Sequence, residues 1–291
     1  MFYAVSWTLK HILLTRLPAR PNAHLLAIEA ACHADWILAS LDIDKAFLKG
    51  LTYKELADAT GEKERVVCCT LPPGSAHILR SFPGFEDYDE AKHCLQSEKP
   101  GTGTKDAPRA FSLKLRQTTR NMGLQPTSYD EEFEIAENLR TTKHVDDVNM
   151  TGVERRIDDY VKAVEKVFGE CKVTKHTFTN LGVRHAKLAN GDVQLDQDEY
   201  IKTLRPITTS ELTGAPAEAY ATKFVTGQFI SLRGAIAYTV LTQSWIQVHV
   251  VALQRIQQPT NLDVRRLNAI TRKLQKELLK LVFPAMTCDG E

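Results

Sequence analysis

The sequence lacks most features that would place it at once in a special class of protein. It has no internal repeat, no low-complexity segment, and a net charge of only +1 over 291 residues. Its six cysteines form no C-x-x-C pair and no Cys/His spacing typical of a zinc site, which favours reduced thiols in an intracellular protein. A content of 43% hydrophobic and 25% charged residues argues against collagen, coiled coil and disorder.

Apolar runs long enough to cross a membrane are also lacking. The longest, residues 224–253, is interrupted by Gln228, Arg233, Gln243 and His249. The apolar N-terminal stretch is broken by Lys10 and His11, and neither a leading basic region nor a small-residue cleavage site accompanies it. Residues 1–24 are therefore an uncertain leader, and we expect a soluble protein of the cytoplasm or nucleus with no membrane partner.

Strand and helix signals alternate in the first two thirds of the chain. A helix is predicted through residues 157–168, where Gly169 ends it, and Pro108 is typical of a helix's first turn. The dipeptide Asn190-Gly191 predicts a hairpin turn. Apolar, β-prone runs predict strands at 36–43, 66–71, 173–178 and 193–197. This mixture favours an α+β fold with helices on one face of an antiparallel sheet.

Beyond Pro206 the pattern is helical and moderately basic. Residues 171–291 carry 15 Lys and Arg against 10 Asp and Glu. The last predicted helix, 261–281, has one apolar stripe, and basic residues occupy the rest of its surface. Such a helix is either a solvated helix with one packed face or a surface that contacts a nucleic-acid backbone.

Three aspartates are the strongest candidates for chemistry. Asp42 ends the first predicted strand, and Asp146 and Asp147 lie in a probable hairpin turn 104 residues later. Three carboxylates brought together repel one another unless cations lie between them. Oxygen ligands of this kind suit two Mg²⁺ or Mn²⁺ ions, which can stabilise an in-line phosphoryl displacement. A solvated turn is the alternative, as for the doublet Asp158-Asp159, which we attribute to a helix dipole.

The aspartates lie in a series of four recognisable segments: SLDIDKAFLKG, GTKDAPRAFSLKL, HVDDVNMTG and FTNLGVRHAKLANGDVQLDQDEYIKTL. In this order the segments resemble the reverse transcriptase of copia-type LTR retrotransposons. The later SLRGAIAYTVLTQSW is similar to the segment after that polymerase core. The resemblance implies a right-hand polymerase palm with an antiparallel sheet, partial fingers and a helical thumb-like or connection-like part. Fingers and palm would occupy residues 25–205, with residues 51–95 as a fingers insertion, and the helical part residues 206–291.

The resemblance also implies roles for individual residues at the catalytic centre. Asp42 and Asp146 would be catalytic metal ligands, with Asp147 as the supporting carboxylate and the Ile43 carbonyl on the nucleotide-side metal. Phe47 would select deoxynucleotides by its bulk, although a plain core aromatic explains it equally well.

Further roles concern the nucleotide and the nucleic acid. Lys105, with Gly103 and Pro108, lies in the segment that would pack under the nascent base pair and the template. Arg109 is either a phosphate contact or a surface salt bridge, and the hairpin that includes Leu181-Gly182 would hold the primer end.

The implied function is RNA-directed DNA synthesis on an RNA or DNA template–primer duplex, with deoxynucleoside triphosphates as substrates. The alternative is a catalytically inactive or domesticated retroelement remnant that only binds nucleic acid. The polar stretch 140–144 before the doublet favours this alternative, and the three aspartates favour the enzyme. An aspartyl-phosphate hydrolase with a D-x-D nucleophile at Asp42 is a poor third reading, because Ala46 stands where that motif expects Thr or Val.

Overall fold

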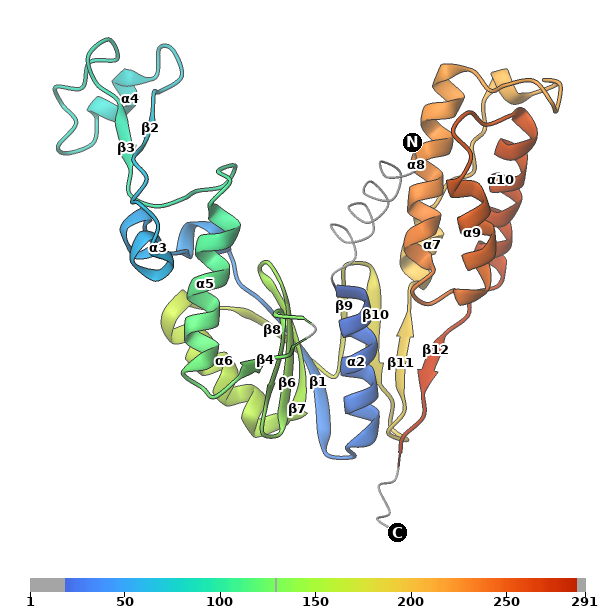
Figure 1. Cartoon of the computed structure of the whole chain (residues 1–291), viewed down its shortest axis with the longest axis horizontal. Coiled ribbons are helices and arrows are strands. Elements are labelled where there is room, and N and C mark those ends of the chain that lie inside the picture. The colour runs from blue at the N-terminus through green and yellow to red at the C-terminus, as the bar shows by residue number, and fades with distance from the viewer. Residues whose placement is uncertain (1–18, 129, 287–291) are drawn as a thin grey trace.

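The computed structural model describes residues 19–128 and 130–286. These residues contain two larger antiparallel sheets, a two-stranded ribbon and a helical region (Figure 1). Most of the predicted leader lies outside the described residues. The larger sheet has six strands and contains the first predicted strand almost unchanged. In sheet order its strands are β4 (Gln125–Pro126), β5 (Phe133–Ala136), β6 (Leu139–His144), β7 (Asp147–Val153), β1 (Trp36–Asp42) and β8 (Lys172–Lys175).

Helices cover both faces of the larger sheet, which corrects the prediction of helices on one face. On one face, α5 (Ala107–Arg120) and α6 (Glu154–Phe168) pack against alternate residues of β1, β6 and β7 to form the largest apolar core. Pro108 lies in the first turn of α5, and Gly169 ends α6 with a positive φ of 77°, both as predicted. On the other face, alanines of α2 (Ala19–Cys32) contact Leu38 (Figure 1).

The second sheet packs against α2 from the opposite side, so that this helix lies between two sheets (Figure 1). Its β10–β11 hairpin turns at Asn190-Gly191, as predicted from the sequence. The four strands, in sheet order, are β12 (Leu281–Phe283), β11 (Val193–Asp196), β10 (Val183–Lys187) and β9 (Thr177–Asn180).

One predicted strand is divided between the two sheets. The prediction placed a single strand at 173–178, but His176 has a φ of 67° and breaks the chain into β8 and β9. A residue with positive φ interrupts the regular extended backbone of a strand. The segments before and after His176 therefore pair with different strands. β8 joins β1 in the larger sheet, and β9 joins β10 in the smaller one.

The helical region forms a core of its own. Its helices are α7 (Asp198–Thr203), α8 (Lys223–Thr239), α9 (Gln247–Gln254) and α10 (Asn261–Lys276), with short 3₁₀ turns η2 (Ser210–Leu212) and η3 (Ser244–Ile246). A Thr260–Asp263 capping box begins α10. The prediction that α10 reaches residue 281 is wrong, because Leu281 belongs to β12 and pairs with Leu195. The helical core also includes Ile201 of α7, so apolar packing crosses the predicted boundary at residue 206.

Residues 61–99 form an arm that projects from α3 (Tyr53–Thr60) in Figure 1. The arm contains α4 (Ala76–Arg80) and a two-stranded ribbon of β2 (Val67–Cys69) and β3 (Leu95–Ser97). Most of its residues are exposed, including large apolar side chains such as Phe82. β2 corresponds to the strand predicted at 66–71.

Among the described residues, no helix is both long and apolar enough to cross a bilayer.

Candidate active site

Two of the three predicted catalytic aspartates face each other across neighbouring strands. β1 and β7 run antiparallel in a register that pairs Asp42 with Asp147. Asp146 lies one residue before β7, and its carbonyl accepts a hydrogen bond from the Ile43 amide at 3.3 Å. Sequence positions 104 residues apart thus meet at one edge of the sheet, as the sequence analysis predicted.

The turn that carries Asp146 is tight and strained. In the β6–β7 hairpin, His144 pairs with Asp147, so that only Val145 and Asp146 form the turn. Val145 has a φ of 59°, in the left-handed region that β-branched residues avoid. Such a conformation costs about 1–2 kcal/mol, and strain of this kind is often found at functional sites.

The three aspartates form no salt bridge with a described residue. None of the three carboxylates has a hydrogen bond or ion pair to another described residue. Burial raises the pKa of Asp147 above its ordinary value, and the negative charges of Asp146 and Asp42 raise it further. His144 acts in the opposite direction. The fold therefore brings like charges together and leaves the half-buried Asp147 carboxylate less stable than in the unfolded chain.

An Asp147→Asn variant should therefore be more stable than the wild type at neutral pH. Because the pKa of Asp147 is raised in the folded state, its contribution to stability falls as pH rises from the ordinary aspartate value through the raised one. Removing a like charge from a cross-strand pair should add about 0.5 kcal/mol to the free energy of unfolding. Urea unfolding at several pH values measures the gain, which should vanish below the ordinary aspartate pKa. A loss of stability at pH 7 would contradict this account.

The donor chemistry at this edge suits a hard divalent cation, because carboxylate oxygens are the ligands that Mg²⁺ and Mn²⁺ prefer. The side chains are not assembled around a single point, however. Within residues 19–128 and 130–286, no three or more His, Cys, Asp or Glu side chains are grouped closely enough to hold a metal ion. An ion at this edge would therefore require the aspartate side chains to rearrange.

A second predicted segment packs beside the strand end. After Asp42 the chain forms the 3₁₀ turn η1 (Ala46–Lys49), which lies against α5. Lys114 of α5 donates to the Lys49 carbonyl at 2.9 Å, and the Leu51 amide donates to the Ala110 carbonyl at 3.3 Å. The structure thus brings the first two motifs together. Phe47 is half-buried and packs against the main core, as the core-aromatic alternative expects.

The loop before α5 and the first turn of this helix expose the other predicted residues of that motif. Gly103 has a φ of 93°, and Lys105 and Pro108 are exposed. Arg109 makes a bidentate salt bridge with Glu62, with N–O distances of 2.9 and 3.0 Å. The surface salt bridge is therefore present, and a phosphate contact by Arg109 stays a prediction.

Leu181-Gly182 forms the turn between β9 and β10, apart from the aspartates in sequence but tied to β7. Both residues have positive φ, 46° and 74°. Asn180 beside them donates to Asn149 of β7 at 3.1 Å, and the Tyr238 hydroxyl of α8 donates to the Leu181 carbonyl. This turn therefore joins the larger sheet to the helical region.

The second acidic doublet has a different explanation from the one predicted. Asp158 and Asp159 lie in the second turn of α6, whereas Glu154 occupies the first turn. Asp158 forms an ion pair with Lys175 of β8 at 2.7 Å, and Glu154 forms one with the same lysine at 2.8 Å. An ion pair between this helix and a lysine of β8 accounts for Asp158, which lies beyond the first turn of α6.

Lys172 is a neighbour of the site that the sequence analysis missed. β8 pairs with β1 so that Lys172 lies opposite Asp42, on the side away from Asp147. The side chain is exposed and makes no ion pair with a described residue. Only the position of β8 beside β1 reveals it, because the predicted strand began at residue 173.

Comparisons with known proteins point to mobile genetic elements. The sequence matches no protein-family model. It is similar to the retrovirus-related Pol polyprotein from transposon RE1 of Arabidopsis thaliana, with 21% identity over 267 residues. The matched region covers 86% of this chain and 17% of the polyprotein, so the chain spans about a sixth of that protein's length. The similarity supports an origin of the chain in a retrotransposon Pol region.

Proposed function

We propose that the chain is the reverse transcriptase part of a copia-type retrotransposon Pol polyprotein. The observation that carries the proposal is the register that pairs Asp42 with Asp147 and places Asp146 in the adjoining turn. A related Pol polyprotein and the order of the four motifs support the same reading. In this proposal the larger sheet with α5 and α6 is the palm, the arm at 61–99 belongs to the fingers, and the helical region is the thumb or connection.

The proposed reaction is RNA-directed DNA synthesis with two divalent cations, Mg²⁺ or Mn²⁺. Bound ions of this kind stabilise the attacking and the leaving oxygen of an in-line phosphoryl displacement. Asp42 and Asp146 would hold the ions with the Ile43 carbonyl, while the Asp147 carboxylate supports them from the paired strand. The rise in the pKa of Asp147 supports the proposal, since cation binding would relieve the repulsion that causes part of it.

The proposed substrates are a template–primer duplex and deoxynucleoside triphosphates. Phe47 in η1 follows Asp42 by five residues and would contact the sugar, and the exposed Lys105 would contact the incoming nucleotide. Gly103, Pro108 and Arg109 would lie along the template, and the Leu181-Gly182 turn along the primer. Phosphate contacts from basic residues of α10 would make duplex binding weaken steeply with salt.

Primer extension on an RNA template tests the proposal. The chain is incubated with a labelled DNA primer, deoxynucleotides and either Mg²⁺ or Mn²⁺, and chelation with EDTA is the control. Metal-dependent lengthening of the primer is expected. A preference for deoxynucleotides over ribonucleotides that is lost in Phe47→Ala would support the role of the ring. Absence of lengthening with both metals would reject the polymerase activity.

An inactive nucleic-acid-binding remnant is the second candidate. It is favoured by the lack, within the described part of the chain, of three acidic, histidine or cysteine side chains grouped to hold a metal ion. The salt bridge between Arg109 and Glu62 favours it too, because it occupies the guanidinium group that would contact a phosphate. This candidate predicts salt-sensitive binding of a primer–template duplex with no incorporation of nucleotides.

A further inference from the structure

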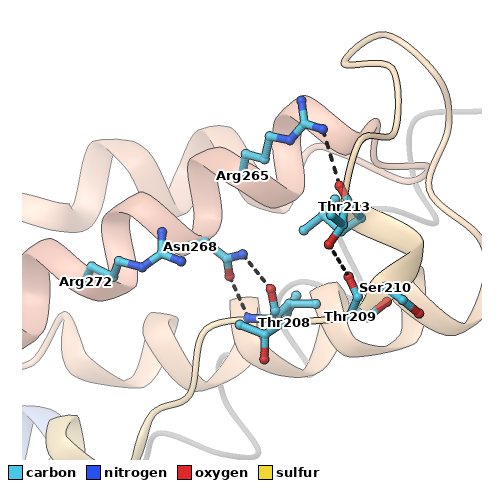
Figure 2. Close-up of a pocket in the computed structure, with 9 residues that line it drawn as sticks. Thr208, Thr209, Ser210, Thr213, Arg265, Asn268 and Arg272 are labelled. Atoms are coloured by element: carbon cyan, nitrogen blue, oxygen red, sulfur yellow. Dashed lines mark hydrogen bonds between the residues drawn. The ribbon is translucent and has the colours of Figure 1, made fainter.

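A cavity of about 400 Å³ lies in the helical region, between α10 and the segment 207–213 (Figure 2). Hydroxyl side chains of residues 208–213 line one wall, and Arg265, Asn268 and Arg272 line the other. The three α10 residues are spaced i, i+3 and i+7, so they lie on one face of the helix. Figure 2 shows the two arginines on either side of Asn268, facing the hydroxyl-bearing segment.

Asn268 of α10 links this helix to the start of the segment 207–213. Its Oδ1 accepts from the Ile207 amide at 2.7 Å, and its Nδ2 donates to the Ile207 carbonyl at 2.8 Å. The side chain is buried, so these bonds hold the segment 207–213 at a fixed place beside α10. The cavity is therefore built into the fold before any ligand arrives.

The two guanidinium groups at the cavity are not neutralised by the protein. Within the described part of the chain, Arg265 donates only to main-chain carbonyls, those of Ala215 at 2.5 Å and Leu212 at 3.4 Å. Arg272 has no hydrogen bond or ion pair to any described residue, and no Asp or Glu is among the residues that line the cavity.

Two of the three other basic residues of α10 have acidic partners. Arg266 pairs with Asp263 at 3.6 Å, and Lys273 pairs with Glu277 at 3.7 Å. The third, Lys276, has no ion pair with a described residue, but it does not line the cavity. The cavity face is therefore where two arginines without acidic partners lie together.

We propose that this cavity binds a phosphate group. Guanidinium groups match the oxygens of a phosphate with two parallel N–H donors, and hydroxyl side chains supply further donors. The phosphate would come from a free phosphorylated small molecule or from the backbone of a single-stranded nucleic acid. The inference does not depend on polymerase activity, because it uses none of the aspartates at the sheet edge.

Isothermal titration of the full chain at fixed ionic strength tests the site with two probes, pyrophosphate and a single-stranded DNA oligonucleotide. The test variant is Arg272→Ala, whose exposed side chain leaves no partner unsatisfied. The control is Lys162→Ala, which removes the same charge from an exposed side chain of α6, outside the helical region that is proposed to contact the duplex. Arg272→Ala should weaken binding about tenfold, since each charge-assisted bond is worth about a factor of ten or more.

Each outcome bears on the site. A loss of pyrophosphate affinity confined to Arg272→Ala supports a free phosphate ligand. The same confined loss with the oligonucleotide alone supports a backbone phosphate. If the wild type binds neither probe, or if both variants lose affinity equally, the site is overturned. The variant Asp146→Asn should bind both probes like the wild type, which separates this test from that of the polymerase.

Discussion

Replacing Glu134 with leucine should reduce the free energy of unfolding by about 3–5 kcal/mol, because it leaves a buried lysine without its partner. Lys143 of β6 donates to Glu134 of β5 at 2.5 Å, and each side chain is almost completely buried, at 2% and 1% exposure. Thr119 of α5 also donates to Glu134, at 3.1 Å. Burial lowers the pKa of Lys143, while the charge of Glu134 and its hydrogen bond raise it.

A double variant distinguishes loss of the pair from loss of packing. In Glu134→Leu/Lys143→Met, neither charge is buried and similar volume is kept, so most of the stability should return. The matched control is Glu131→Leu, which removes an exposed partner of Arg116 and should cost less than about 1 kcal/mol. Urea unfolding measures all three variants. If the double variant is no more stable than Glu134→Leu, the buried ion pair is not the cause.

The pH dependence of Glu134→Leu gives a second check. Without Glu134 the pKa of Lys143 should fall further, so the unfolded state binds the additional proton. Stability of the single variant should therefore rise as pH increases from neutral to alkaline values, up to the ordinary lysine pKa. The wild type should show a smaller rise, confined to higher pH.

This pair explains why the stretch before the aspartate doublet looked unsuitable for a sheet. In residues 140–144 the sequence shows threonines and a lysine where an apolar strand is expected. The lysine is explained by its acidic partner, Glu134, which lies on the neighbouring strand β5. Strand pairing of this kind leaves no periodic signal. β6 is a regular inner strand of the larger sheet, paired on both sides. Its polarity is therefore weaker support for an inactive remnant than the sequence suggested.

Local signals predicted most elements, and contacts between distant segments account for the differences. β1, α5, α6 and the Asn190-Gly191 hairpin follow from periodicity and turn chemistry. The split at His176 and the return of Leu281 to β11 depend on tertiary pairing that no local pattern records. The meeting of Asp42 and Asp147 was predicted from strand ends alone. Lys172 was missed because it lies on β8, and the sequence did not show that β8 pairs with β1.

Replacing Asp146 with asparagine should reduce RNA-templated primer extension by about 10²- to 10³-fold or more, the size of effect seen when a group that stabilises transition-state charge is removed. Asparagine has nearly the same shape, and the Asp146 carboxylate makes no hydrogen bond or ion pair with a described residue. The main-chain bond from Ile43 to the Asp146 carbonyl is unaffected. Unfolding in urea should therefore show no loss of stability, so that a loss of activity reports on the reaction.

The second doublet supplies the control for that experiment. Asp159→Asn makes the same chemical change at an exposed side chain of α6, away from the strand ends, and should leave extension unchanged. Excess Mn²⁺ should restore part of the activity of Asp146→Asn, because higher ion occupancy compensates for one weakened ligand. Equal extension by the wild type and Asp146→Asn would show that these aspartates are not the catalytic centre. Equal, salt-sensitive duplex binding with no extension by either would instead identify the nucleic-acid-binding remnant.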